Sequence, residues 1–380
     1  MAEQLTWETL RELAAFRAEQ GCAVSLYLDL DPSVTPTAGD VDTRLHSLLG
    51  TAERSDGVTR EELSHEAREA LKGDLQRLRD YVENEFDRAG VHGLAVFAAG
   101  ADGSWRTLSL GDRVPDEVAV GSTFRLAPLV SHMGGADGAL VAVVSRERGE
   151  VFRLREGRLH ELADLSEEAP RRHDQGGRSQ ARFQRHVDEF AADHLRTVTD
   201  ELNRRVRRLG HMDVVIVCAE PMRGDVEALL AKETKDALAG WAAAEAHAGA
   251  PELLEVVKPI LEEARVRRVE ETLERWREEA GKGARASSGW AQTLEAASDG
   301  KVELLLFRDG ANREVWECPS CGRLTAEAGD CPLDGTTLER RDEGLDPTVH
   351  QVLAYGGTVL AVQDRPDLDP VEGIGALLRF

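Results

Sequence analysis

Apolar runs of strand length alternate along this chain with charged stretches of helical pattern. Of all its sequence features, this alternation limits the possible folds most strongly. The runs at residues 24–30, 139–144 and 213–218 have the length of β-strands. They fall far short of the roughly 20 residues that a bilayer-spanning helix requires. Helical patterns lie between them, above all over residues 180–209. The alternation predicts α/β domains without a membrane span.

The length of the chain sets the number of domains. Its 380 residues are too many for one ordinary hydrophobic core, so two or three domains are expected. We predict three α/β domains, at residues 1–132, 133–250 and 251–380. The third is expected to carry a small zinc-ribbon-like insert at residues 316–341.

Each predicted domain has its own order of elements. The first should contain a helical hairpin within residues 41–89 and strands at 24–30, 93–97 and 105–108. The second should contain a β-hairpin over 139–154, a helix over 180–209, a strand at 213–218 and a helical stretch over 226–247. The third should contain a helix that ends near residue 280 and strands at 302–307 and 357–362.

Composition excludes several classes of protein. A hydrophobic content of 41% excludes global disorder. The net charge of −23 argues against a protein that coats nucleic acid by bulk attraction, because phosphates would repel most of its surface. Any RNA contact must therefore come from a local basic patch. Residues 1–16 have the pattern of an acidic amphipathic helix and not of a signal peptide, so the expected location is the cytoplasm.

The polar loop over residues 171–180 supplies such a patch. Gly176 and Gly177 permit backbone conformations and close approaches that other residues adopt only with strain. The helix expected after the loop points its free N–H groups toward it. The cationic residues around the glycines are Arg171, Arg172, His173, Arg178, Arg182 and Arg185. These cationic residues and the two glycines together suit contact with a phosphate or an RNA backbone. The alternative interpretation, a flexible loop with solvated arginines, fits the composition equally well.

Residues 169–183 carry a resemblance to a known family. They read Ala-Pro-Arg-Arg-His-Asp-Gln-Gly-Gly-Arg-Ser-Gln-Ala-Arg-Phe. This stretch resembles the central-domain motif of the archaeo-eukaryotic class-one peptide release factors: Pro-Lys-Lys-His, two residues, Gly-Gly-Gln-Ser, two residues, Arg-Phe. Segments 290–297 and 373–380 are also similar to that family. The resemblance implies a three-domain architecture, and the ribosome, ribosomal RNA and the tRNA acceptor stem as partners.

One departure from the family motif concerns the catalytic glutamine. In release factors this glutamine orients the water that hydrolyses the peptidyl-tRNA ester, and here Arg178 takes its place. Arginine donates hydrogen bonds only and carries charge, so it cannot copy a neutral amide. Shifted along the chain, the segment from Gly177 to Gln180 fits the Gly-x-x-Gln form of the related ribosome-quality-control peptidyl-tRNA hydrolases. Gln180 would then position the water beside Gly176 and Gly177, or it is simply the first residue of a helix.

A second departure concerns codon reading. The first domain lacks the family's Asn-Ile-Lys-Ser and Tyr-x-Cys motifs, and its comparable strand at residues 93–99 reads Gly-Leu-Ala-Val-Phe-Ala-Ala. The loss of both features is similar to the Balon-type ribosome hibernation factors. That likeness implies a monomeric protein that binds the A site, with elongation factor Tu as a candidate escort. A peptidyl-tRNA hydrolase and a general RNA-binding or GTPase-partnered adaptor stay open as alternatives.

The cysteines predict a metal site in the third domain. Cys318 and Cys321 have the spacing of a zinc knuckle, and the glycine that follows them permits a tight turn. The second half of a ribbon would supply Cys331 and, where a fourth cysteine is usual, Asp334. Carboxylate is an acceptable zinc ligand, so a structural zinc is one interpretation and a metal-free, decayed ribbon is the other. The remaining cysteines, Cys22 and Cys218, lie in apolar segments and are expected to be buried free thiols.

Overall fold

The computed structural model describes residues 5–54, 63–130, 133, 138–155, 157–167, 180–210, 212–245, 247–363 and 365–380, without the side chains of residues 54 and 180–188. The chain forms two compact units. The first combines Met1–Met133 with Val269–Phe380 and is called the split unit below. The second, Gly134–Arg268, is called the central unit.

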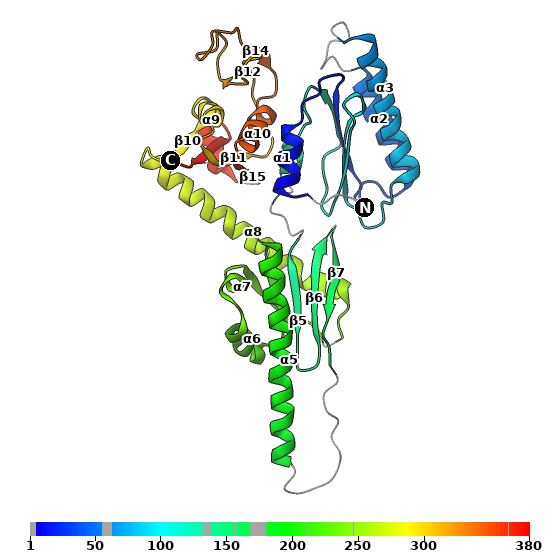
Figure 1. Cartoon of the computed structure of the whole chain (residues 1–380), viewed down its shortest axis with the longest axis vertical. Helices are drawn as coiled ribbons and strands as arrows, with labels where there is room; N and C mark the ends of the chain where they lie inside the picture. Colours follow the sequence, from blue (N-terminus) through cyan, green and yellow to red (C-terminus); the bar gives the residue numbers. More distant parts are fainter. Residues whose placement is uncertain are drawn as a thin grey trace. The chain divides into compact units, whose positions relative to one another are not determined.

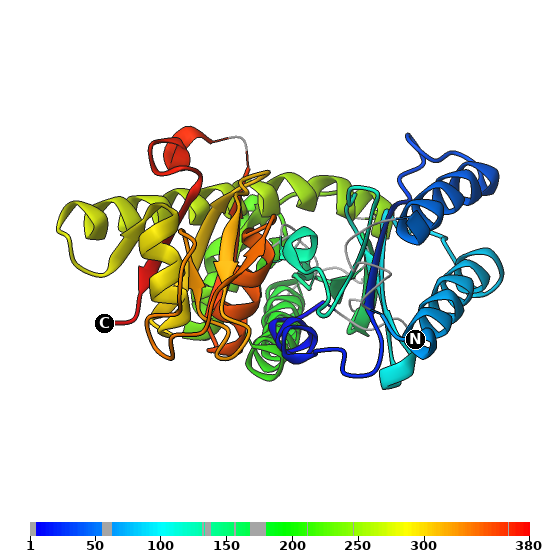
Figure 2. The same ribbon diagram turned by 90° about the horizontal axis from the view of Figure 1, so that it is seen from above.

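The N-terminal half of the split unit is built on an antiparallel sheet in the order β3-β2-β1-β4. Its strands are β1 (Ala23–Asp29), β2 (Gly93–Ala99), β3 (Ser104–Leu110) and β4 (Glu117–Gly121). Helices α2 (Ala38–Arg54) and α3 (His65–Asp80) cover one face, and α1 (Trp7–Ala15) lies on the other (Figures 1 and 2). The predicted helical hairpin and the three predicted strands are confirmed, and β4 is an additional strand.

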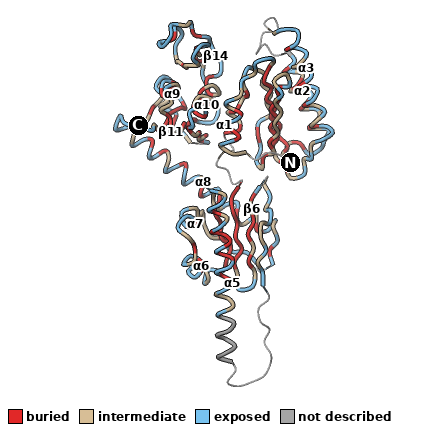
Figure 3. The backbone as a smooth tube through the Cα atoms, viewed as in Figure 1, coloured by how far each residue is buried: buried red, intermediate tan, exposed pale blue. Residues whose placement is uncertain are grey.

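Strand β1 is buried on both faces, which explains its continuous apolar sequence. Successive side chains of a strand point to opposite faces. Val24, Leu26 and Leu28 accordingly pack into the cluster beneath α2 and α3. Tyr27 packs into the cluster on the opposite side, among residues of α1. Figure 3 shows β1 and β2 as the buried centre of this half.

The C-terminal half of the split unit is built on a second sheet, in the order β10-β16-β11-β15. Its strands are β10 (Ala286–Ser288), β11 (Val302–Arg308), β15 (Thr358–Val362) and β16 (Ile374–Leu378), and its helices include α9 (Gly289–Ser298) and α10 (Leu345–Ala354). Strands β11 and β15 are parallel, whereas β16 runs antiparallel to β11. One hydrophobic cluster contains residues of both sheets, and α1 lies against α10 (Figure 1). The two halves therefore share a core.

A partly buried polar contact also joins these two halves. Oδ1 of Asp346 on α10 accepts hydrogen bonds from the backbone N–H groups of Leu126 and Ala127. The ring nitrogens of His350 lie 3.1 Å from the carbonyl oxygen of Ala14 and 2.6 Å from that of Phe124. A carbonyl oxygen only accepts, so hydrogen bonds to both carbonyls require hydrogen on both ring nitrogens, as in the charged imidazole. The contact thus places beside a carboxylate a histidine whose hydrogen-bond acceptors favour its charged form.

The central unit contains a five-stranded sheet in the order β7-β6-β5-β8-β9. Its strands are β5 (Leu140–Val144), β6 (Gly149–Arg155), β7 (Arg158–Asp164), β8 (Val214–Val217) and β9 (Leu238–Ala242). The 30-residue helix α5 (Gln180–Leu209) packs on one face together with α6 (Arg223–Leu229). The first part of α8 (Ala250–Gly281) covers the other face through Leu253, Val257 and Leu261. The predicted hairpin, helix and strand of this segment are confirmed.

The helical stretch expected over residues 226–247 is wrong. The segment holds the end of α6, the short helix α7 (Lys232–Asp236) and then β9, which pairs in parallel with β8. Asn203 of α5 holds the break between the two helices, because its Oδ1 accepts from the backbone N–H of Ala231 and from Oγ1 of Thr234. The alanine-rich sequence favours a helix locally, but tertiary hydrogen bonds and pairing with β8 override that preference.

The insert in the C-terminal half is a small antiparallel sheet in the order β13-β12-β14. Its strands are β12 (Val315–Glu317), β13 (Leu324–Thr325) and β14 (Glu339–Arg341). The predicted α/β class, with a ribbon-like insert between β11 and β15, is confirmed. Among the helices of the described residues, none combines the length and the apolar content needed to cross a membrane.

Candidate metal centre and glycine loop

The insert is built from two similar turns that face each other. In the first, Gly322 N–H donates to the carbonyl oxygen of Cys318, and in the second Gly335 N–H donates to that of Cys331. The two glycines have φ angles of 75° and 73°, a left-handed conformation that favours glycine. Cys331 is thus the counterpart of Cys318. Asp334 takes the place in the second turn that Cys321 holds in the first.

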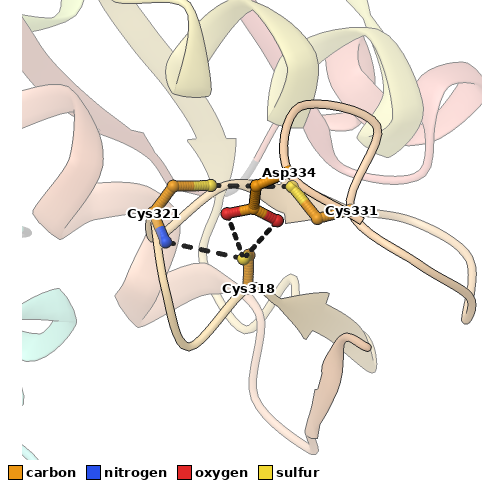
Figure 4. Close-up of side chains that lie close together, drawn as sticks. All are labelled: Cys318, Cys321, Cys331 and Asp334. Carbon is orange, nitrogen blue, oxygen red and sulfur yellow. Dashed lines mark hydrogen bonds between the residues drawn. The ribbon is translucent and has the colours of Figure 1, made fainter. Parts of the chain in front are cut away.

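The four ligand groups converge as the sequence predicted (Figure 4). Cys318, Cys321, Cys331 and Asp334 each offer one ligand atom, and these atoms lie within 4.8 Å of one another. Sγ of Cys321 is 3.6 Å from Sγ of Cys331. Sγ of Cys318 is 3.7 and 3.6 Å from the two carboxylate oxygens of Asp334. The spacing brings three sulfurs and one carboxylate around a common centre.

These separations fit a tetrahedral zinc ion. Zinc–sulfur bonds of about 2.3 Å and zinc–oxygen bonds of about 2.1 Å place two sulfurs about 3.8 Å apart, and a sulfur and an oxygen about 3.6 Å apart. The observed sulfur–sulfur and sulfur–oxygen distances agree with both values. In addition, the backbone N–H of Cys321 lies 3.5 Å from Sγ of Cys318, where it stabilises a thiolate. The cluster could therefore hold a metal ion.

The second turn orients Asp334 for this role. Its Oδ1 accepts a hydrogen bond of 3.0 Å from the backbone N–H of Thr336. Hydrogen bonds from Thr336 hold the pKa of the Asp334 carboxyl well below its usual range, so the group is a carboxylate at neutral pH. Sequence reasoning did not identify Thr336. Its place directly after Gly335, in the copy of the first turn, is the signal that would have found it.

The ligands differ in their exposure. Cys318 and Cys331 are buried and form a small apolar cluster with Leu338, against which Trp316 packs. Cys321 is exposed. The insert is anchored to the body of this half because the backbone N–H of Leu324 donates to Oγ of Ser298, and Arg323 pairs with Asp299. The other two cysteines, Cys22 and Cys218, are buried free thiols, as expected.

The predicted glycine loop lies outside the described residues. This holds for Gly176, Gly177, Arg171, Arg172, His173 and Arg178. Gln180, Arg182 and Arg185 belong to the first turns of α5, but their side chains are not described. The structure describes the strand before the loop and the helix after it. Strand β7 ends at Asp164 before it, and α5 begins at Gln180 after it.

The described part of α5 is firmly seated on the sheet of the central unit. Leu195, Val198 and Leu202 belong to the core beneath it. Gly149 of β6 permits a close approach, because a Cβ atom at that position would lie 2.3 Å from Cγ2 of Val198. The helix is therefore held along its C-terminal half, while its N-terminus follows directly on the loop.

Comparisons with known proteins agree with the loop motif. Residues 125–265 match the family described as bacterial archaeo-eukaryotic release factor family 10. The peptide chain release factor subunit 1 of Methanobrevibacter smithii is 24% identical over 335 residues, which are 83% of this chain and 78% of that protein.

Two solved structures are similar at low identity. The archaeal translation termination factor aRF1 is 17% identical with a TM-score of 0.27, over 99% of each chain. Dom34 of S. cerevisiae, a translation termination-like factor, is 11% identical with a TM-score of 0.40, over 76% of this chain and 79% of that one. The segment matched by the family contains the whole Gly-Gly motif of residues 169–183. Over residues 125–265 the chain is therefore similar to the bacterial branch of the archaeo-eukaryotic release factors.

Proposed function

We propose that the protein binds the ribosomal A site without decoding a stop codon and acts as a ribosome hibernation or stress factor. The observation that carries the proposal is Arg178, which stands where the release-factor motif has its glutamine. It lies inside the segment that matches the family. A charged side chain that only donates hydrogen bonds cannot orient a hydrolytic water as a neutral amide does. The loop is then suited to occupy a site on RNA and not to release a peptide.

The architecture of the central unit supports this proposal. Helix α5 has 30 residues and is about 45 Å long at 1.5 Å per residue. The C-terminal half of α5 packs into the core of the central unit, so it is a rigid support for the glycine loop that precedes the helix. The free N–H groups and the positive dipole end at that N-terminus favour a phosphate. The cationic residues predicted around the loop are Arg171, Arg172, His173, Arg178, Arg182 and Arg185. The partners we propose are ribosomal RNA and the tRNA acceptor stem, with elongation factor Tu as escort.

Binding to empty ribosomes tests the proposal. Purified protein is sedimented with vacant bacterial ribosomes at increasing salt. We expect co-sedimentation that weakens as salt rises, because phosphate contacts release counterions. The double substitution Arg171→Glu and Arg172→Glu should abolish it. Arg196→Glu is the matched control, since Arg196 is an exposed arginine of α5 that pairs with Asp193. Absence of binding at the lowest salt would refute the proposal.

A second candidate function is hydrolysis of peptidyl-tRNA. Gln180 is the first residue of α5 and follows the loop directly, at the last position of the Gly-x-x-Gln pattern that begins at Gly177. A glutamine there could present its amide to a water at the loop. This candidate predicts that peptide release requires Gln180 and tolerates loss of Arg178. A general RNA-binding or GTPase-partnered adaptor would show neither release nor a preference for the A site.

We further propose that the four-ligand cluster binds zinc in a structural role, and that the chain comprises the three predicted domains. Three sulfurs and one carboxylate whose ligand atoms lie within 4.8 Å of one another are a donor set typical of zinc. Bound zinc would hold the two turns of the insert together, and we assign it no catalytic step. Metal analysis of the purified full chain should give one zinc per chain. Protein that lacks stoichiometric metal when isolated under reducing conditions would contradict the zinc proposal.

A further inference from the structure

The four ligands of the cluster form two unlike pairs. Cys321 and Cys331 face each other with their sulfurs 3.6 Å apart, whereas Cys318 faces the carboxylate of Asp334 (Figure 4). A disulfide has a sulfur–sulfur bond of about 2.05 Å, so the first pair must close by about 1.5 Å to form one. The two cysteines come from different turns, and each turn is closed by its own backbone hydrogen bonds. A small approach of one turn toward the other is sufficient.

Exposure makes the same pair accessible to an oxidant. Cys321 is exposed, whereas Cys318 is fully buried and Cys331 is 3% exposed. A soluble oxidant therefore meets Cys321 first. Sγ of the buried Cys331 lies 3.6 Å from the sulfur of Cys321. This is the arrangement of an attacking cysteine with a resolving cysteine beside it.

The carboxylate in the fourth position determines what such a reaction would do. A disulfide between Cys321 and Cys331 removes two of the four ligands at once. Cys318 and Asp334 remain, and one thiolate with one carboxylate falls short of the four ligands that a structural zinc site has. Oxidation of a single pair would thus be enough to release the metal.

We propose that Cys321 and Cys331 are a peroxide-sensitive pair whose oxidation to a disulfide releases the metal from the insert. The sulfur of Cys321 attacks one oxygen of hydrogen peroxide, the O–O bond breaks, and a sulfenic acid and one water form. The sulfur of Cys331 then attacks the sulfenic sulfur, and a second water leaves. Two electrons pass from the two sulfurs to the peroxide. Two protons from solvent complete the waters when the thiolates start metal-bound. A dithiol reductant reverses the change.

This inference rests on the proposed zinc binding, and the experiment separates the two. Full-length protein is purified under reducing conditions, and its zinc and free thiols are measured before any oxidant is added. Absence of zinc at that stage overturns the zinc proposal, and with it the metal-release claim. With zinc present, hydrogen peroxide is titrated while released zinc is followed with a chromogenic chelator. Peptide mass spectrometry then identifies the cysteines that are joined.

We expect one equivalent of zinc to leave for each Cys321–Cys331 disulfide formed, and a dithiol with added zinc to restore both. Cys22→Ser and Cys218→Ser are matched controls, because both thiols are buried and neither belongs to the cluster. Both should release zinc at the wild-type rate. In Cys321→Ser protein reloaded with zinc, the peroxide-dependent part of the zinc loss, measured against a sample without peroxide, should be at least about tenfold slower. The inference is overturned if zinc leaves without this disulfide, if the disulfide forms without zinc loss, or if exposed Cys321 only joins two chains.

Discussion

Asp346 and His350, one turn apart on α10, form a partly buried ion pair with Oδ2 of the carboxylate 3.5 Å from Nε2 of the imidazole. Burial alone disfavours the charge on His350, but the hydrogen bond and charge of Asp346, together with the two carbonyl acceptors, raise its pKa above the ordinary value. Burial likewise opposes the charge on Asp346, and the contacts with His350, Ala127 and Leu126 lower its pKa. The pair therefore joins the two halves of the split unit in its charged form.

This pair predicts how the stability of the split unit varies with pH. The raised pKa of His350 contributes stability that is full below its unfolded value of about 6.5 and is lost as pH rises through the higher folded value. The lowered pKa of Asp346 contributes stability above about 3.9 that is lost as pH falls through the folded value. We expect the free energy of unfolding to decline on both sides of this window. His350→Gln should flatten the alkaline decline, whereas His65→Gln, on exposed helix surface, should leave it unchanged. An unchanged alkaline profile in His350→Gln would contradict the account.

Zinc binding by the proposed site should respond in opposite directions to two substitutions of Asp334. Asp334→Ala removes a ligand and should weaken zinc binding at least about tenfold, since even outer-shell changes cost that much. Asp334→Cys completes a four-thiolate set and should strengthen binding. Competition with a chelator measures both affinities. Asp330→Ala serves as the control, because Asp330 is exposed in the same insert and bonds only Thr337 among the contacts described. Equal affinity for all three variants would show that Asp334 is no ligand.

Asn203 should be a stability determinant of the central unit. It is 5% exposed and accepts from Ala231 and Thr234, while its Nδ2 donates to the carbonyl oxygen of Leu229. Asn203→Ala removes the hydrogen-bond partner of the buried Thr234 and of two part-buried backbone groups, which should cost about 2 kcal/mol or more in the free energy of unfolding. Asp200→Ala, at an exposed position one turn earlier, should change it by less than about 0.5 kcal/mol. Denaturant unfolding compares the two, and similar values would contradict the role of Asn203.

Two glycines of the central unit should respond to alanine with opposite signs. At Gly149 the new Cβ would lie 2.3 Å from Val198 and 3.0 Å from the ring of His194. Gly149→Ala should therefore disturb the packing of α5 on the sheet and lower the free energy of unfolding by about 1–3 kcal/mol. At Gly224, within α6, no atom lies within 4 Å of the new Cβ, and alanine is the better helix former. Gly224→Ala should therefore stabilise by about 0.5–1 kcal/mol. Thermal denaturation of both variants checks the sign of each change.

Local sequence patterns were enough for the elements that carry the proposed function. The bounds of α5 follow from its helical pattern, and the four residues that could hold a metal ion follow from cysteine spacing combined with the glycines that close each turn. Such local patterns do not predict contacts between segments that are distant in the sequence. Residues 238–242 form a strand only because β8 lies beside them. The contact of His350 with Phe124 joins residues 226 positions apart, which no local pattern encodes.

Peptide release by the loop is the most direct test of the central claim that the protein occupies the A site without hydrolysis. Purified protein is added to stalled ribosomes that carry labelled peptidyl-tRNA, and peptide release and ribosome binding are measured together for the wild type, Arg178→Gln, Arg178→Ala and Gln180→Ala. The account predicts tight binding and no release by the wild type, and release gained in Arg178→Gln, which restores the family's glutamine. Release by the wild type that is lost in Gln180→Ala and kept in Arg178→Ala would contradict it.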